Sequence, residues 1–323
     1  MSQFDPAADA LTYPLSQLQV SSPDVSDLQV TSKCLGKGSN NKAFSSTYSG
    51  RREKLVLRVP RRRSDTQQRG SALWEFRQTL RASQLGVAPQ LLDGFYARHA
   101  SGEWTSGLYL LMERYECDLE EAISDDADLR ARMLEGSFVT DVGAQVTDHL
   151  KALADDLMFV YDLKPTNLVL RFDENSVDVR IVDYGRDFCE WRGDHADDED
   201  ARTPVLDGLR LLLLKRGTPE GEMDALMKHI LFAAMLVQLS ATTTYNLYED
   251  RDKHRMGSEQ RRSINPFSRL ADSLLGTMQG CNLSALRWLL RTDEVRGVLR
   301  HYHGRRVSGT ERTLMLARGI EVS

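Results

Sequence analysis

The chain contains 323 residues, of which 41% are hydrophobic and 28% are charged, and its formal net charge is −5. This composition is typical of a globular protein large enough for two compact parts, and the net negative charge argues against a nucleic-acid-binding protein. The longest strongly apolar stretch, around Ile230–Leu239, is far shorter than the roughly 20 residues of a membrane-spanning helix, so we expect a buried helix there and no membrane partner.

The N-terminal region and the cysteines predict a cytoplasmic protein. Residues 1–27 contain scattered Ser, Pro, Gln and Asp, which favours a disordered tail, and the first residues lack the basic and apolar segments of a signal peptide. The four cysteines are far apart and form no C-x-x-C pair. We therefore expect free thiols in a reducing compartment rather than disulfides or a zinc site.

The first folded part is expected to span residues 28–115 and to begin with antiparallel strands. Strands are predicted near Leu28–Leu35 and Lys42–Ser49, with a glycine-containing turn between them. The next strand covers Lys54–Val59. The chain therefore starts as a small antiparallel sheet.

A helix and a further strand complete this part. Residues 71–85 carry one apolar stripe formed by Leu73, Phe76 and Leu80, which predicts a helix. Leu108–Tyr115 has the pattern of a buried strand that runs into charged residues.

The second part, residues 116–323, is predicted to be mainly helical. Apolar residues from Val146 to Leu157 recur at intervals of three and four, which predicts an amphipathic helix directly before a polar loop. Two short strands, Leu168–Arg171 and Val177–Val182, are expected to follow that loop. Residues 241–268 are polar and are expected to form a long loop or irregular insertion.

Four residues in this second part supply the groups that phosphoryl transfer needs. A carboxylate at Asp162 can orient an attacking hydroxyl group and accept its proton, and the ammonium group of Lys164 can stabilise the transferring phosphoryl group. Asn167 and Asp183 offer hard oxygen ligands, which suit a magnesium ion that also binds phosphate oxygens. The sequence therefore predicts a phosphoryl-transfer site.

These residues resemble the signature of the protein kinase superfamily. The family has a catalytic loop H-R-D-L-K-x-x-N and a metal loop D-F-G. This chain has V-Y-D-L-K-P-T-N at residues 160–167 and D-Y-G at residues 183–185. The resemblance implies that Asp162 is the catalytic base, that Lys164 contacts phosphate, and that Asn167 and Asp183 bind Mg²⁺.

The resemblance also implies the fold and the cofactors. It predicts a two-lobed α+β fold, with a small antiparallel-sheet lobe over residues 28–115 and a larger, mainly helical lobe over residues 116–323. The implied cofactors are ATP and Mg²⁺. The divergent second half is similar to kinases of large DNA viruses.

The residues that the resemblance assigns to nucleotide binding lie in the first part. They are Gly36, Gly38, Ala43, Arg58, Glu75, Met112, Glu113 and Tyr115. The first three match a glycine-rich loop over the phosphates, with Asn41 at the position of the third glycine; an ordinary turn between strands is the alternative. Met112 matches the gatekeeper, and the backbone of residues 113–115 matches the hinge that meets adenine.

One position in this set departs from the family. Arg58 stands where the family has a strand lysine, and Glu75 matches the helix acid that pairs with it. Arginine keeps the positive charge, but its planar fork is bulkier than an ammonium group. Lys54, on the same strand face, is the alternative candidate.

Two further departures concern regulation. Val160-Tyr161 replaces the family's His-Arg, so activation by phosphorylation is not expected. No A-P-E motif closes the segment after Gly185. The acidic residues 194–200 are interpreted as a solvated loop, or as a surface that engages basic substrate or the arginines of the first lobe.

The expected function is a serine/threonine kinase that transfers the γ-phosphoryl group of ATP to protein substrates, because Lys164 after the base is typical of that class. A small-molecule kinase is the second hypothesis, based on Arg58 and the missing A-P-E motif. A pseudokinase that binds nucleotide or a partner without turnover is the third, although it has no need for Asp162, Asn167 and Asp183 together.

Overall fold

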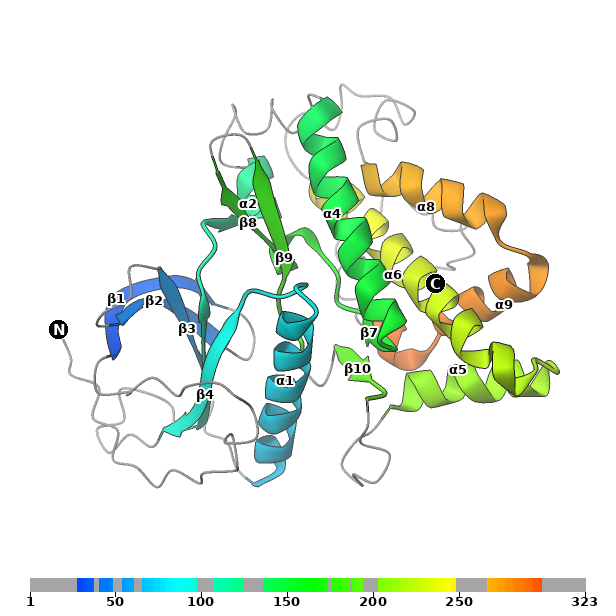
Figure 1. Ribbon diagram of the computed structural model, residues 1–323, viewed down its shortest axis with the longest axis horizontal. Coiled ribbons are helices and arrows are strands. Elements are labelled where there is room, and N and C mark those ends of the chain that lie inside the picture. Colours follow the sequence, from blue (N-terminus) through cyan, green and yellow to red (C-terminus); the bar gives the residue numbers. More distant parts are fainter. Residues whose placement is uncertain are drawn as a thin grey trace. The chain divides into compact units, whose positions relative to one another are not determined.

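The computed structural model describes residues 28–37, 41–48, 54–60, 66–97, 107–124, 136–173, 176–185, 188–193, 203–247 and 266–297. These residues form two compact units (Figure 1). Unit 1 contains the described residues up to Tyr115, together with Tyr184 and Gly185, and unit 2 contains the rest. The tail predicted for residues 1–27, Gly38 and the acidic residues 194–200 lie outside the described residues.

Unit 1 is built on a five-stranded antiparallel sheet with the order β1-β2-β3-β5-β4. Its strands are β1 (Leu28–Lys37), β2 (Asn41–Tyr48), β3 (Leu55–Pro60), β4 (Leu91–Ala97) and β5 (Gly107–Glu113). Together with α1 (Thr66–Gln84), the sheet confirms the predicted antiparallel sheet with one helix.

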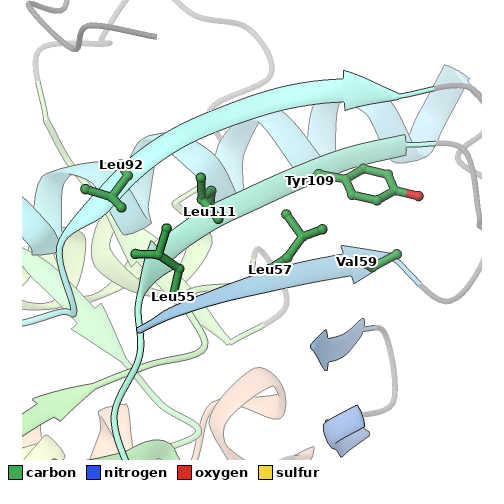
Figure 2. Packing of buried hydrophobic residues seen from close by; sticks show 6 residues of the cluster. All are labelled: Leu55, Leu57, Val59, Leu92, Tyr109 and Leu111. Carbon is green, nitrogen blue, oxygen red and sulfur yellow. The ribbon is translucent and has the colours of Figure 1, made fainter. Parts of the chain in front are cut away.

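The side-chain period of two divides this sheet into two apolar faces. On one face, a cluster buries Leu55, Leu57, Val59, Leu92, Tyr109 and Leu111 (Figure 2). Leu110 and Met112 alternate with the β5 members of that cluster and form a second cluster with Phe76 of α1. Burial of each such side chain stabilises the unit by about 1.5–3 kcal/mol.

Helix α1 is fixed against the second face of the sheet by close packing of Phe76 on Gly94, and it is terminated at Gly86. The ring of Phe76 lies directly over Gly94 of β4, where a Cβ atom would overlap it. The helix ends before Gly86, which has a φ of +69° and is followed by a bond from the Val87 amide to the Ala82 carbonyl at 2.9 Å. The helix that carries Glu75 is therefore held at a defined position on the sheet.

Unit 2 is mainly helical and contains two small sheets, with strand orders β6-β8-β9 and β10-β7. Its helices are α2 (Leu119–Ser124), α4 (Gly136–Asp155), α5 (Pro204–Lys215), α6 (Glu220–Leu247), α8 (Pro266–Thr277) and α9 (Gly280–Leu289). Its strands are β6 (Cys117–Asp118), β7 (Met158–Val160), β8 (Leu168–Phe172), β9 (Val177–Ile181) and β10 (Cys189–Trp191), with the 3₁₀ turn η3 (Pro165–Asn167).

Helix α6 is the core of unit 2. It contacts α4, α5, α8 and α9, and it runs between α4 and α8 in Figure 1. Of residues 230–239, all except Phe232 are buried. The buried helix predicted around Ile230–Leu239 is therefore present, as the middle of a much longer element.

The prediction of a long loop over residues 241–268 is wrong at both ends. Residues 241–247 continue α6, and α8 begins at Pro266. The polar residues Thr242 and Thr243 belong to a helix because they are buried in the core of unit 2, and tertiary packing outweighs their weak helix propensity. Residues 248–265 lie outside the described residues.

The apolar character of α6 also extends further than the sequence interpretation assumed. Among the described residues, one helical segment, Glu220–Thr243 of α6, is long and apolar enough to cross a membrane by length and composition alone. Its most apolar window is 72% buried by the surrounding protein. Packing in the core of unit 2 accounts for its composition.

Candidate functional site

The loop that carries Asp162 is mounted on a buried strand and closed by a tight turn. Strand β7 is fully buried and pairs with β10, so the chain is rigidly held up to Val160. Pro165 begins the turn η3, where its fixed φ suits the first position, and the Asn167 amide donates to the Lys164 carbonyl at 2.9 Å. The loop therefore spans only Tyr161–Lys164.

Two side-chain contacts hold the loop. Lys164 Nζ donates to Asp162 Oδ2 at 2.7 Å, and Asn167 Nδ2 donates to the Asp162 carbonyl at 2.8 Å. Asp162 and Asn167 are both buried. Because the amide nitrogen of Asn167 binds the Asp162 carbonyl, the side-chain oxygen Oδ1 is the atom that Asn167 can offer to a cation.

Asp183 lies at the same end of the β8–β9 pair as Asn167. Leu168 pairs with Ile181 across the two strands, and the Val182 amide donates to the Asn167 carbonyl at 2.9 Å. The backbone thus brings Asp183 next to the loop from a separate stretch of sequence. Asn167 and Asp183 offer a carbonyl oxygen and a carboxylate, which are ligands that suit magnesium.

Asp183 has an unusual backbone conformation. Its φ is +76°, in the left-handed region that residues with a side chain rarely occupy. Such a residue costs on the order of 1–3 kcal/mol and persists where the surrounding structure or a function requires it.

The residues around this loop do not form an all-protein metal cage. In the parts of the chain that the structure describes, no group of three or more His, Cys, Asp and Glu side chains is arranged to hold a metal ion. Two protein oxygens fit an ion that takes its other ligands from phosphate and water, as magnesium does.

In unit 1, the structure brings together two of the predicted residues. Arg58 Nη1 on β3 lies 2.7 Å from Glu75 Oε1 on α1, and the side chains are only 17% and 18% exposed. Lys54 precedes β3 and is exposed. The pairing expected of the strand cation is therefore made by Arg58.

Of the other described first-part residues, Gly36, Ala43, Met112 and Glu113 lie on β1, β2 and β5, and Tyr115 follows β5. Gly36 and Ala43 are partners across the β1–β2 hairpin. Met112 is buried in the α1-facing cluster, and the Glu113 amide donates to the Gln90 carbonyl at 2.9 Å. Tyr115 is buried at the end of unit 1.

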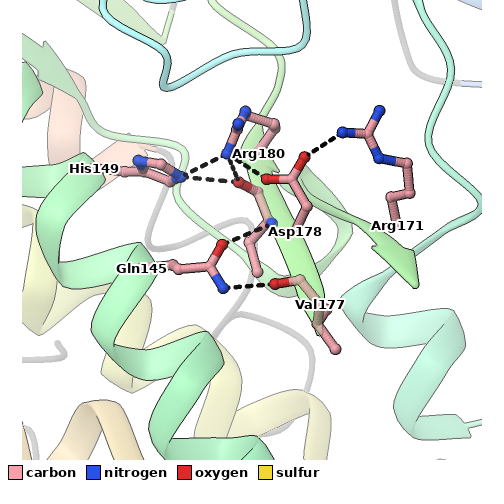
Figure 3. Close-up of polar contacts among 7 residues, drawn as sticks. Gln145, His149, Arg171, Val177, Asp178 and Arg180 are labelled. Carbon is pink, nitrogen blue, oxygen red and sulfur yellow. Dashed lines mark hydrogen bonds and ion pairs between the residues drawn. The ribbon is translucent and has the colours of Figure 1, made fainter. Parts of the chain in front are cut away.

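Helix α4 is hydrogen-bonded to the strand that leads to Asp183 (Figure 3). Gln145 donates to the Val177 carbonyl at 2.5 Å and accepts from the Val179 amide at 3.2 Å, and His149 Nε2 lies 2.8 Å from the Val179 carbonyl. Burial lowers the pKa of His149 below its usual value, which favours the neutral ring. These contacts close the free edge of β9 and fix its path.

An ion-pair network on strands β8 and β9 also stabilises the path of β9 towards Asp183. Asp178 of β9 lies 2.7 Å from Arg171 Nη2 and 2.5 Å from Arg180 Nη1 (Figure 3). Because the groups are partly exposed, each pair contributes at most about 1 kcal/mol.

Glu190 is a buried acid that the sequence interpretation missed. Its carboxylate accepts from the amides of Val205 at 3.1 and 3.2 Å and Leu206 at 3.0 Å, at the start of α5. Burial raises its pKa to about 7; the two amide bonds oppose this rise, and the charges of Asp207 and Glu294 add to it. The sequence did contain a signal for this contact. Glu190 lies between Cys189 and Trp191 on a short strand, and Thr203-Pro204 marks the start of the helix that follows.

Comparisons with known proteins do not assign the chain to a family. No protein-family model matches the chain, and no curated protein matches it.

Proposed function

We propose that this protein is an ATP- and magnesium-dependent phosphotransferase of the protein kinase type, with serine or threonine hydroxyls of proteins as acceptors. The observation that supports this proposal most directly is the closed loop of unit 2. Lys164 and Asn167 both donate hydrogen bonds to Asp162, and Asp183 lies just beyond the end of the adjacent strand β9. These hydrogen bonds hold together the residues to which the catalytic-loop resemblance assigns the reaction, which supports the proposal.

The ion pair in unit 1 supports the same proposal. A strand cation held by a helix acid is the arrangement that positions ATP phosphates in kinases. Here Arg58 is held by Glu75 at 2.7 Å, so its guanidinium group is oriented rather than free to sample solvent. Arginine can bind two phosphate oxygens at once with its fork.

In the proposed reaction, Asp162 orients the acceptor hydroxyl and takes its proton. The acceptor oxygen forms a bond to the γ-phosphorus of ATP, the bond from that phosphorus to the bridging oxygen breaks, and ADP leaves with the electron pair. Lys164, already 2.7 Å from Asp162, is placed to stabilise charge on the transferred group. Magnesium bound by Asn167 and Asp183 would neutralise phosphate charge.

A small-molecule acceptor is the second candidate. Arg58, rather than lysine, makes the pair with Glu75. By the resemblance, some small-molecule kinases of the superfamily also carry arginine at this position. The two candidates share the catalytic residues and differ only in the acceptor.

The proposal is tested by transfer of labelled γ-phosphate from ATP by the full chain, with magnesium, to protein mixtures and to metabolite pools. Asp162→Asn is expected to lower the rate by about 10²–10⁴. Asp173→Asn, at an exposed position just beyond β8, is the matched control and is expected to leave the rate unchanged.

Three outcomes are informative. Transfer only to metabolites would favour the second candidate. Nucleotide binding without transfer in any pool would support a pseudokinase and refute the proposal. Equal rates for the two variants would exclude Asp162 as the base.

A further inference from the structure

A threonine of the core helix α6 contacts the middle of the Asp162 loop. Thr242 is 2% exposed, and its hydroxyl donates to the Leu163 carbonyl at 2.9 Å. Leu163 lies between Asp162 and Lys164, and its own side chain is buried. The contact joins residues 79 positions apart in the chain.

The Leu163 carbonyl is the closest of the three acceptors near the Thr242 hydroxyl. The Gln238 and Leu239 carbonyls of α6 itself lie at 3.1 and 3.2 Å, whereas the Leu163 carbonyl is closer. A hydroxyl group has one proton to donate. The shorter distance favours donation to the Leu163 carbonyl. This carbonyl also lies in a loop, so unlike the carbonyls of Gln238 and Leu239 it has no amide of its own helix to bond with.

Three successive carbonyls of the loop each accept a hydrogen bond. The Asp162 carbonyl accepts from the Asn167 side chain, the Leu163 carbonyl from Thr242, and the Lys164 carbonyl from the Asn167 amide. Two of these bonds are local to the loop. The bond from Thr242 is the one among the three that ties the loop to the helical core.

We propose that Thr242 is a positioning residue for the phosphoryl-transfer loop, an inference that rests on the proposed function. By fixing the Leu163 carbonyl, its hydroxyl sets the orientation of the peptide plane between Leu163 and Lys164, next to the plane of the Asp162 carbonyl that Asn167 holds. Those planes determine where the side chains of Asp162 and Lys164 point. A displacement of about 1 Å at such groups costs up to roughly 100-fold in rate.

The adjacent residue provides a matched control. Thr243 is also 2% exposed on α6, and within the described chain its hydroxyl has no hydrogen-bond partner. Replacing either threonine by valine removes the same hydroxyl from the same buried helix and keeps the shape. Only Thr242→Val removes a bond to the loop.

The test compares Thr242→Val, Thr242→Ser and Thr243→Val in the full chain. Thr242→Val is expected to lower kcat by about 10- to 100-fold, with KM for ATP changed less than about threefold. Thr242→Ser, which keeps the hydroxyl, is expected to stay within about threefold of the original rate, as is Thr243→Val. A loss of stability alone would lower the folded fraction and leave the rate per folded molecule unchanged.

Hydrogen–deuterium exchange provides a second readout that does not require activity. The backbone amides of residues 162–164, 166 and 167 are expected to exchange faster in Thr242→Val than in Thr243→Val; Pro165 has no amide proton. If the original protein transfers no phosphate, the proposed function fails, and exchange still decides whether Thr242 holds the loop. Equal exchange and equal rates in the two valine variants would overturn the inference, as would a Thr242→Ser variant as slow as Thr242→Val.

Discussion

Replacing Glu190 by glutamine removes a buried carboxylate while keeping its shape, and the expected effect on stability depends on pH. In the folded protein the pKa of Glu190 is about 7, compared with 4.5 for an unperturbed glutamate. Between these values the folded state binds more protons than the unfolded state. The free energy of unfolding of the original protein should therefore fall as pH rises from about 4.5 through about 7.

The size of this fall follows from the same difference in pKa. A rise from 4.5 to about 7 corresponds to about 3 kcal/mol at pH values above both, as an upper limit for this buried group. In the glutamine variant, the side-chain oxygen can still accept from the amides of Val205 and Leu206. The variant keeps the contact with α5 and loses the ionisation.

Urea unfolding at pH values from 5 to 8 measures the effect. The free energy of unfolding of Glu190→Gln, relative to the original protein, is expected to rise with pH by up to about 3 kcal/mol over this window. Glu222→Gln, at an exposed position in the first turn of α6, is the control and should follow the original protein. Parallel pH profiles for the original protein and Glu190→Gln would refute the assignment of a buried, titrating carboxylate.

Two further predictions concern unit 1. Glu75→Gln should lower phosphate transfer by about 10-fold or more, because it weakens the ion pair that holds Arg58 at 2.7 Å; a rate equal to that of the original protein would exclude this role. Gly94→Ala should lower the free energy of unfolding by about 1–3 kcal/mol in urea, because its Cβ would overlap a core aromatic ring. Gly221→Ala, on α6 of unit 2 with open space around it, should instead be neutral or stabilising by up to about 1 kcal/mol, and the reverse order of the two variants would contradict this reasoning.

Strands β1, β2, β3, β5, β8 and β9 and the first helix were predictable from sequence because their signals are local, whereas β4, β6, β7 and β10 were not predicted. Strand β3 was expected at residues 54–59 and lies at Leu55–Pro60, since alternating apolar residues mark its buried face. Helix α1 begins at Thr66, five residues before the predicted start, because its first turns are polar and carry no apolar period. Local pattern therefore identified the elements better than their ends.

Other features could not be predicted because they depend on contacts between distant residues. The threonines at the end of α6 are poor helix formers, and only their burial against the core and the Leu163 carbonyl explains a helix there. Glu190 is bonded to amides 15 and 16 residues later. By contrast, Asp162, Lys164 and Asn167 lie within six residues, so their grouping was readable from the sequence.

The left-handed backbone at Asp183 implies that selection for stability and selection for activity favour different residues at this position. Glycine would adopt a φ of +76° without strain, so heat-resistance screening of a randomised library at this codon should enrich glycine. Screening the same library for turnover should retain aspartate, since glycine carries no oxygen to offer a cation. The residue found at position 183 after selection would therefore show whether a library had been selected for stability or for turnover.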